Sequence, residues 1–283
     1  MTRSSIYIAA GLIAATSVLA AASSPRAAEK LVVAADVGYA PHIMAKPDGG
    51  FEGYNVDMIA EIARRLGRDY EIVDQEWSGI FAGLNAKKYD FIIAPTTVTP
   101  ERAEKMLFME GYLDSEIVFL VKKESPEITK PEDLKGKIIS VNRGNIYDKW
   151  ASERAEEYGW TMQRYGKNAD AIQAVLSGRA DANIASGSAS GWAAKQNPLL
   201  KTSLVVKTGS VFSAPFRLED VALRNQIEEV VECMKLAGFF SKLHEKWFSA
   251  PAQAGSAMVS VEAGYGAPGV KGYEATFHAL KCG

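Results

Sequence analysis

Short apolar runs alternate with amphipathic segments in the first third of this 283-residue chain. The runs are rich in Val, Ile and aromatic residues, which is typical of buried strands. They occupy residues 31–34, 70–73 and 91–94. Apolar residues at helical spacing predict a helix from Asn55, its expected N-cap, to Leu66, and a shorter helix around 80–84. This strand–helix order predicts a parallel sheet covered by helices.

The same pattern begins again after a strand predicted at 116–121. The second unit is expected to contain a helical turn at 131–134, strands at 137–141, 161–165, 182–185 and 204–206, and helices at 148–158, 169–177 and 188–196. Helices at 218–236 and 239–248 then return to the first unit. The prediction is an α/β fold of two Rossmann-like lobes. The expected divisions are a first lobe of residues 29–120 and 212–249, an inserted second lobe of residues 121–211, and a C-terminal extension of residues 250–283.

The first residues have the pattern of a secretory signal peptide. Arg3 forms a short basic region, residues 6–22 are apolar and rich in alanine, and Ala20 to Ala22 are small residues suited to cleavage. The alternatives are cleavage as late as Ala28 and an uncleaved N-terminal anchor. No cysteine lies near the cleavage site, so a lipid anchor is not indicated. We therefore expect residues 1–22 to be removed, leaving a monomer in the periplasm that is not embedded in the membrane.

Charge and composition narrow the classes of function. The net charge of −2 predicts no polybasic surface and no nucleic-acid partner. Three histidines and two cysteines argue against a zinc site with several ligands, and we expect neither a metal nor a cofactor. Export makes a disulfide between Cys233 and Cys282 plausible, which would tie the C-terminal extension to the fold. The alternative is two free thiols.

The stretch from Ala94 to Arg102 is the strongest candidate for chemistry. It follows the apolar run at 91–94, and the carboxyl ends of strands are where open α/β sheets bind ligands. Thr99 is placed to cap a helix that starts at Pro100, with Arg102 in its first turn. An arginine fork matches a carboxylate bidentately. The alternative is a threonine-rich turn with a surface arginine.

Several motifs in one order give the sequence a family resemblance. They are Asp36-x-x-Tyr39-x-Pro41, Gly53-Tyr54-Asn55-Val56-Asp57, Trp77-x-Gly79-Ile80, Lys88-Tyr89-Asp90, Thr97-Val98-Thr99-Pro100-Glu101-Arg102, Asp133-Leu134-Lys135-Gly136-Lys137, Gly178-Arg179-x-Asp181-Ala182 and Lys246-Trp247-Phe248. With them, residues 31–248 resemble the periplasmic solute-binding proteins of ABC importers for polar amino acids. The resemblance implies two lobes joined by two hinge strands, which close on a ligand and present it to permease subunits. It implies a receptor and no enzyme.

The resemblance also assigns roles to individual residues. A ligand carboxylate is expected to meet Arg102, the Thr97 hydroxyl and backbone groups at Ala94, Thr96 and Ile146. Tyr39 and Trp77 match aromatic walls around the ligand side chain. Asp36 matches an acid that meets the distal amine in relatives that bind cationic amino acids. Alternatively, Tyr39 and Trp77 are aromatic residues of the core, and the Asp36 carboxylate caps its own loop.

Three positions depart from the family pattern. Pro95 removes a backbone donor, and Asn145 stands where relatives have a hydroxyl. Ser186 replaces the acid that meets the ligand's α-ammonium. Ser186 and Tyr147 can accept a hydrogen bond but bring no charge, and a buried ammonium without a counter-charge is costly. The departures favour an N-substituted or opine-like derivative, or a carboxylate without the amine.

Two other functions remain as alternatives. One is a cyclohexadienyl-dehydratase-like enzyme on the same fold, although Ser186 stands where such relatives have their catalytic glutamate. The other is a sensor whose closed lobes are read by a partner other than an importer. His42 stands where relatives usually have Phe, and we interpret it first as a packing residue and second as a ligand contact.

Overall fold

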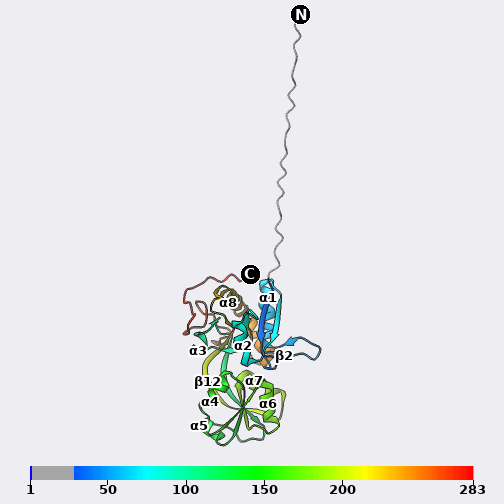
Figure 1. The fold of residues 1–283 in the computed structure, drawn as a ribbon, viewed down its shortest axis with the longest axis vertical. Helices are drawn as coiled ribbons and strands as arrows, with labels where there is room; N and C mark the ends of the chain where they lie inside the picture. The colour runs from blue at the N-terminus through cyan, green and yellow to red at the C-terminus, as the bar shows by residue number, and fades with distance from the viewer. Residues whose placement is uncertain (2–28, 283) are drawn as a thin grey trace.

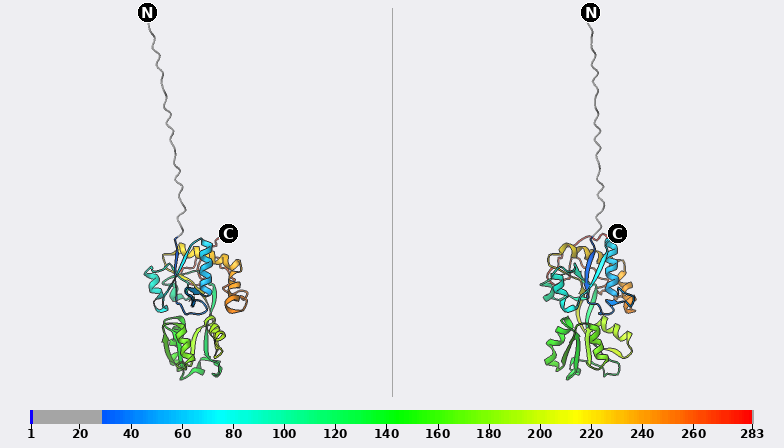
Figure 2. Two further views of the ribbon diagram at one scale, coloured as in Figure 1. Left: turned by 90° about the vertical axis from the view of Figure 1, so that its right-hand side faces the viewer. Right: turned by 45° about the vertical axis from the view of Figure 1, so that its right-hand side comes forward.

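The computed structural model describes Met1 and residues 29–282, which fold into two stacked lobes (Figures 1 and 2). The signal-peptide prediction, apart from Met1, lies outside the described residues. None of the helices in residues 29–282 is long and apolar enough to cross a bilayer.

The first lobe is built on a five-stranded sheet with the order β4-β1-β5-β13-β7. Its strands are β1 (Leu31–Ala35), β4 (Tyr70–Asp74), β5 (Phe91–Ile92), β7 (Leu107–Phe108) and β13 (Pro215–Phe216). β1 pairs in parallel with β4 and β5, as the strand–helix order predicted. The helices are α1 (Tyr54–Leu66), α2 (Trp77–Asn85), α3 (Pro100–Ala103), α8 (Val221–Leu236) and α9 (Phe239–Phe248), and a small hairpin joins β2 (Met44–Ala45) to β3 (Phe51–Glu52).

The second lobe is built on a six-stranded sheet with the order β10-β9-β11-β8-β12-β6. Its strands are β6 (Thr96–Thr97), β8 (Leu113–Lys122), β9 (Ile138–Asn142), β10 (Thr161–Tyr165), β11 (Ala182–Ser186) and β12 (Leu200–Ser213). Its helices are the 3-10 turn Pro131–Leu134, α4 (Ile146–Glu153), α5 (Ala155–Tyr158), α6 (Asn168–Leu176) and α7 (Gly187–Gln196). The single helix predicted at 148–158 is therefore two helices. The strand predicted at 204–206 is part of the much longer β12.

Two long antiparallel strands, β8 and β12, connect the lobes (Figure 1). Near the first lobe, Phe212 of β12 pairs with Leu113 of β8 on one side and with Thr97 of β6 on the other. The chain then enters the first sheet through β13. The mixed α/β architecture with two connecting strands confirms the predicted fold class. Because the hinge is made of continuous strands, the lobes can rotate without breaking the sheet of either one.

Each lobe has its own apolar core. In the first lobe, α1 buries Ile59 and Ile62 against the sheet, as its helical spacing predicted. In the second, Phe119 packs with Trp160 and Ile139. Separate cores allow each lobe to move as one body.

Asn55 does not cap α1, contrary to the prediction. Gly53 occupies the N-cap position with φ of 142°, where a Cβ would lie 2.2 Å from the carbonyl oxygen of His42. The Asn55 amide is instead fully buried and donates to the carbonyl of Ile93 at 2.6 Å and to the hydroxyl of Tyr112 at 2.7 Å. The capping preference of Asn gives way here to a tertiary hydrogen-bond network.

The C-terminal extension packs on the first lobe through buried polar groups of α8. Glu228 accepts a hydrogen bond from the backbone N–H of Gly266 at 2.7 Å, and the Arg224 guanidinium donates to the carbonyl of Gly272 at 3.1 Å and to Glu274 at 2.8 Å. Arg224 and Glu228 are both fully buried. The predicted disulfide between Cys233 and Cys282 is confirmed and joins the end of the extension to α8.

Removing the disulfide should destabilise the first lobe. The bridge spans 49 residues, so in the chain-entropy model its loss costs about 4 kcal/mol. We expect the double variant Cys233→Ser/Cys282→Ser to unfold at a lower urea concentration than the oxidised protein, measured by circular dichroism. The reduced wild type is the control and should match the variant. Equal midpoints for the oxidised protein and the variant would show that the extension is held by its buried polar contacts alone.

Candidate functional site

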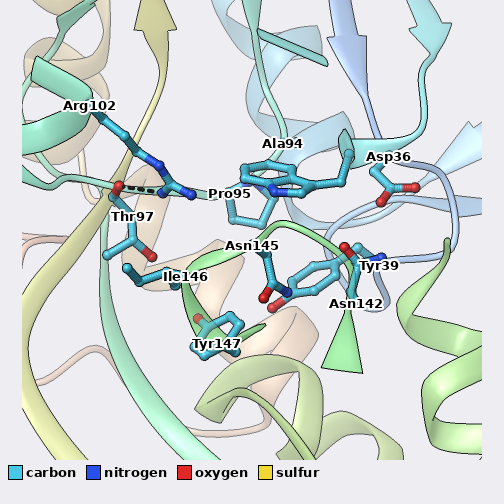
Figure 3. Close-up of a pocket in the computed structure, with 11 residues that line it drawn as sticks. Asp36, Tyr39, Ala94, Pro95, Thr97, Arg102, Asn142, Asn145, Ile146 and Tyr147 are labelled. Carbon is cyan, nitrogen blue, oxygen red and sulfur yellow. Dashed lines mark hydrogen bonds between the residues drawn. The ribbon is translucent and has the colours of Figure 1, made fainter. Parts of the chain in front are cut away.

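A cavity lies between the lobes, near the carboxyl ends of strands from both sheets (Figure 3). Its lining from the first lobe is Asp36, Tyr39, Trp77, Ala94, Pro95 and Arg102, its lining from the second is Asn142, Asn145, Ile146 and Tyr147, and Thr97 lies in β6, which pairs with β12. The segments follow β1, β5 and β9, so strand ends from both lobes face one another. This is where α/β sheets bind ligands.

Arg102 brings a positive charge to the cavity, and its side chain is only partly exposed to solvent. Thr99 caps α3 as predicted, because its hydroxyl accepts the N–H of Arg102 at 3.2 Å. The guanidinium donates to the carbonyl of Thr97 at 2.8 Å and lies 5.5 Å from the centre of the Trp77 ring. Burial lowers the pKa of Arg102 to about 10, so the group stays charged at neutral pH. The neighbouring Glu101 pairs with Lys149, and none of the ion pairs within residues 29–282 includes Arg102.

Asp36 brings a negative charge, but this charge already has a partner. Lys167, from the second lobe, places its Nζ 2.8 Å from Asp36 Oδ1 and 2.9 Å from Asp74 Oδ1. Burial raises the pKa of Asp36, and Lys167 opposes that rise. Arg102 and Asp36 lie at opposite sides of the cavity (Figure 3). The two charged ends of the cavity therefore differ, since one has a protein counter-ion and the other has none in the described chain.

The walls of the cavity are held by bonds across the cleft. Trp77 donates its indole N–H to the carbonyl of Gly144 at 3.2 Å, and Tyr39 donates its hydroxyl to Ser186 Oγ at 3.0 Å. Both aromatic rings are buried, with 7% and 9% of their surface exposed. Asn145 caps α4 by accepting the N–H of Asp148 at 2.8 Å. Its amide is thus engaged in the helix start and sets the position of Ile146, the next residue of the lining.

Two of the predicted site residues do not line the cavity. Thr96 is fully buried and donates its hydroxyl to the carbonyl of Ala94 at 2.9 Å. Ser186 is also fully buried, and its hydroxyl oxygen accepts bonds from Tyr39 and from the N–H of Ala189, which it caps in α7. Ser186 therefore lies behind Tyr39, with its lone pairs engaged by the protein.

Asn142 lines the cavity and was not predicted. It is the last residue of β9, and its side-chain amide donates to the carbonyl of Gly166 at 3.0 Å. A polar residue at the carboxyl end of a predicted strand, just before the Gly144 turn, was the available signal.

The comparisons with known proteins agree with this geometry. Residues 31–250 match the model of the bacterial extracellular solute-binding proteins, family 3. The chain belongs to this family. It is 28% identical over 221 residues to a probable amino-acid ABC transporter-binding protein of Haemophilus influenzae (strain ATCC 51907 / DSM 11121 / KW20 / Rd), covering 77% of this chain and 84% of that protein.

Solved structures support the same family and fold. An ancestral arginine-binding protein bound to arginine superposes on this solute-binding protein with a TM-score of 0.74 and 28% identity, covering 77% of this chain and 98% of the other. The ancestral amino acid-binding protein AncCDT-1, described as a precursor of cyclohexadienyl dehydratase, gives a TM-score of 0.71 and 29% identity over 77% and 95% of the two chains. The protein is thus a substrate-binding receptor of the class that serves ABC importers.

The lobes of this solute-binding protein are closed on one another. The free interior of the cavity is about 20 Å³, close to the space that one buried water molecule needs. Hydrogen bonds of Tyr39 and Trp77 cross the cleft, so a ligand can enter only when the lobes stand further apart than they do here.

His42 contributes to this closed arrangement without lining the cavity. It is fully buried, and its Nδ1 lies 2.8 Å from Asn55 Oδ1 while its Nε2 lies 2.7 Å from Ser188 Oγ in α7 of the other lobe. Tyr39, Tyr54 and Phe212 pack around the ring. Burial lowers the pKa of His42 to about 4, so the imidazole is neutral in the folded protein at neutral pH.

The burial of neutral His42 should make the free energy of unfolding depend on pH. Between pH 6.5, the ordinary value, and about 4, the unfolded chain binds a proton at His42 that the folded chain does not. Stability should therefore rise with pH in this window, by up to about 3 kcal/mol. We expect urea unfolding at pH 4.5 and 7.5 to show a larger rise for the wild type than for His42→Gln. Parallel pH profiles for the two proteins would contradict the prediction, since all other groups titrate in both.

Proposed function

We propose that this protein captures an amino acid or amino-acid derivative by its carboxylate, closes on it, and presents it to the permease subunits of an ABC importer. The moving bodies are taken as residues 29–120 with 212–249 and residues 121–211. The signal-like residues 1–22 support a location in the periplasm.

Arg102 carries the proposal. A buried guanidinium is stable only with a compensating charge or dense hydrogen bonding. Arg102 donates to one carbonyl and faces the cavity, and no ion pair of the described residues involves it. A planar carboxylate is the ligand group that its fork matches best. The anchor expected from the strand-end motif therefore has the chemistry that the role requires.

Closure of the lobes is the proposed signal to the importer. The cavity is lined from both lobes, so a ligand contacts both only in the closed form. A ligand shifts a conformational equilibrium only through its differential affinity for the two forms. A carboxylate on Arg102 with further contacts to the second lobe near Ile146 supplies that difference.

The environment of Ser186 bears on the nitrogen of the ligand. An unmodified amino acid brings an α-ammonium, which needs an anionic partner when buried. Ser186 is engaged by Tyr39, and Asp36, the one carboxylate among the lining residues, is paired with Lys167. This supports a ligand whose nitrogen is substituted, as in opine-like conjugates, or absent.

A dehydratase-like activity is the weaker candidate. General acid catalysis needs a proton donor within reach of the reacting group. Ser186 lies behind Tyr39, and Asp36 is held in an ion pair at the far end from Arg102. A sensor that passes its closed form to another partner would use the same cavity. Co-purification with permease subunits distinguishes the importer receptor from such a sensor.

Replacing Arg102 should abolish binding of carboxylate ligands. Loss of one member of a buried charge-assisted pair costs about 2–5 kcal/mol of binding free energy. We expect Arg102→Ala to lose this much in isothermal titration calorimetry with the tightest ligand from a panel of the twenty amino acids and a set of opines. Arg179→Ala, which removes the same charge from an exposed position, should bind as the wild type does. Unchanged affinity in Arg102→Ala, with circular dichroism showing a native fold, would place the anchor elsewhere.

Replacing Ser186 with aspartate, an acid like that of relatives, should change which ligands the protein prefers. Aspartate is a good N-cap, so Ser186→Asp can keep the start of α7 while adding a negative charge next to the cavity. We expect the wild type to prefer N-substituted amino acids and the variant to gain affinity for unmodified ones, by about tenfold or more. Ser190→Asp, a substitution at another buried serine of the same helix, is the matched control. Tight binding of an unmodified amino acid by the wild type would remove the N-substituted ligand from consideration.

A further inference from the structure

Lys167 reaches across the cleft and forms an ion pair with Asp36, at the side of the cavity opposite Arg102. Lys167 precedes α6 in the second lobe, while Asp36 directly follows β1 and Asp74 ends the neighbouring strand β4 of the first lobe. Its Nζ lies within 2.8 Å and 2.9 Å of their carboxylate oxygens. Asp74 is itself fixed, because it accepts the N–H of Val37 at 3.1 Å. The ammonium thus lies between two positioned carboxylates.

This arrangement fills the place where a cationic ligand side chain would find its counter-ion. Asp36 is nearly inaccessible, with 4% of its side chain exposed, whereas Lys167 keeps 30% of its side chain exposed. A ligand cation at Asp36 would either lie beside the Lys167 ammonium, where like charges repel, or displace it. Displacement breaks an ion pair that is partly buried. Both routes weaken the binding of a ligand with a distal positive charge.

A ligand with a neutral or negative distal group is not repelled by the Lys167 ammonium and can bind to it. A ligand anchored by its carboxylate at Arg102 extends toward Asp36, because these residues lie at opposite sides of the cavity (Figure 3). The Lys167 ammonium has three N–H donors; one donates to Asp74 Oδ1 at 2.9 Å, and the Nζ also forms an ion pair with Asp36. A carboxamide, ureido or carboxylate oxygen can accept the remaining one.

We propose that Lys167 is a specificity-determining residue, which excludes ligands with a distal cation and selects those whose distal end is neutral or anionic. This inference rests on the proposed carboxylate capture at Arg102, since that contact sets which end of the ligand meets Lys167. Lys167 also joins the lobes, so it acts only when the cleft closes.

Arginine and citrulline form a matched pair for the test, because they differ in a guanidinium against a neutral ureido group of similar shape. Each is titrated as the free amino acid and as its N-(1-carboxyethyl) derivative, so that the result does not depend on whether the ligand nitrogen is substituted. Calorimetry at pH 8 keeps Asp36 ionised in variants that lack the lysine. The proteins are the wild type, Lys167→Met and Lys167→Gln.

The matched control is Lys195→Met. Lys195 lies on α7 and donates to Ser249 Oγ at 2.6 Å across the lobes, so its loss removes the same charge and one contact between lobes. Unlike Lys167, it forms no ion pair with Asp36 among the residues that the structure describes. An effect of net charge or of weaker closure alone would appear equally in this variant.

We expect both Lys167 variants to gain affinity for arginine, in at least one of its two forms, by about tenfold or more relative to citrulline. The wild type and Lys195→Met should have the same ratio of arginine affinity to citrulline affinity, and this ratio should be lower than in the Lys167 variants. Failure of both folded Lys167 variants to gain affinity for arginine, or an equal gain in Lys195→Met, would overturn the inference. Loss of binding in Arg102→Ala would still support carboxylate capture in that case. Undiminished binding of the same ligands by Arg102→Ala would instead overturn the proposed function.

Discussion

A buried charge must be compensated, and the two charged residues of this cavity meet that requirement in different ways. Asp36 is paired within the protein by Lys167, at 2.8 Å. Arg102 has the carbonyl of Thr97 at 2.8 Å and two aromatic rings near its guanidinium, Trp77 at 5.5 Å and Phe81 at 5.4 Å. Neutral oxygens and ring faces stabilise a cation less than a carboxylate does. The cavity therefore has one end that favours an incoming anion and one end that is already neutralised.

Several contacts within the first lobe fix the position of Arg102. Thr99 and the proline that follows define the start of α3, and the Arg102 guanidinium donates to the carbonyl of Thr97 in β6. The C-terminal extension adds a disulfide and several buried polar contacts to α8 of the same lobe. It lies on the first lobe and leaves β8 and β12 as the covalent connection between the lobes. A rigid anchor on one side and a flexible connection on the other suit a receptor that reports binding through closure.

Sequence reasoning succeeded where the determinants are local. The apolar periods predicted the longer strands and most helices but not the two-residue strands β2, β3, β6, β7 and β13. The Thr-Pro-Glu-Arg order predicted the cap that positions Arg102. It failed where a distant partner decides. Asn55 has a good capping side chain, but its amide is used by Ile93 and Tyr112, 38 and 57 residues away. Ser186 was expected near the ligand because of the family resemblance, and its hydroxyl accepts a hydrogen bond from Tyr39, 147 residues away, a contact that the sequence did not indicate. Lys167 had no signal at all, since only the closed arrangement brings it to Asp36.

These distant contacts also explain how closure can be sensitive to a small ligand. The bonds of His42 with Ser188 and of Tyr39 with Ser186 join the lobes through neutral groups, and Lys167 adds an ion pair that is open to solvent on one side. Each is worth little in net free energy, because water replaces it when the lobes part. Under the proposed carboxylate capture, the compensation of one guanidinium is large enough to decide between an open and a closed form that differ by these bonds alone. Arg102 then links recognition of the ligand to the position of the lobes, because the carboxylate on its guanidinium also reaches the second lobe.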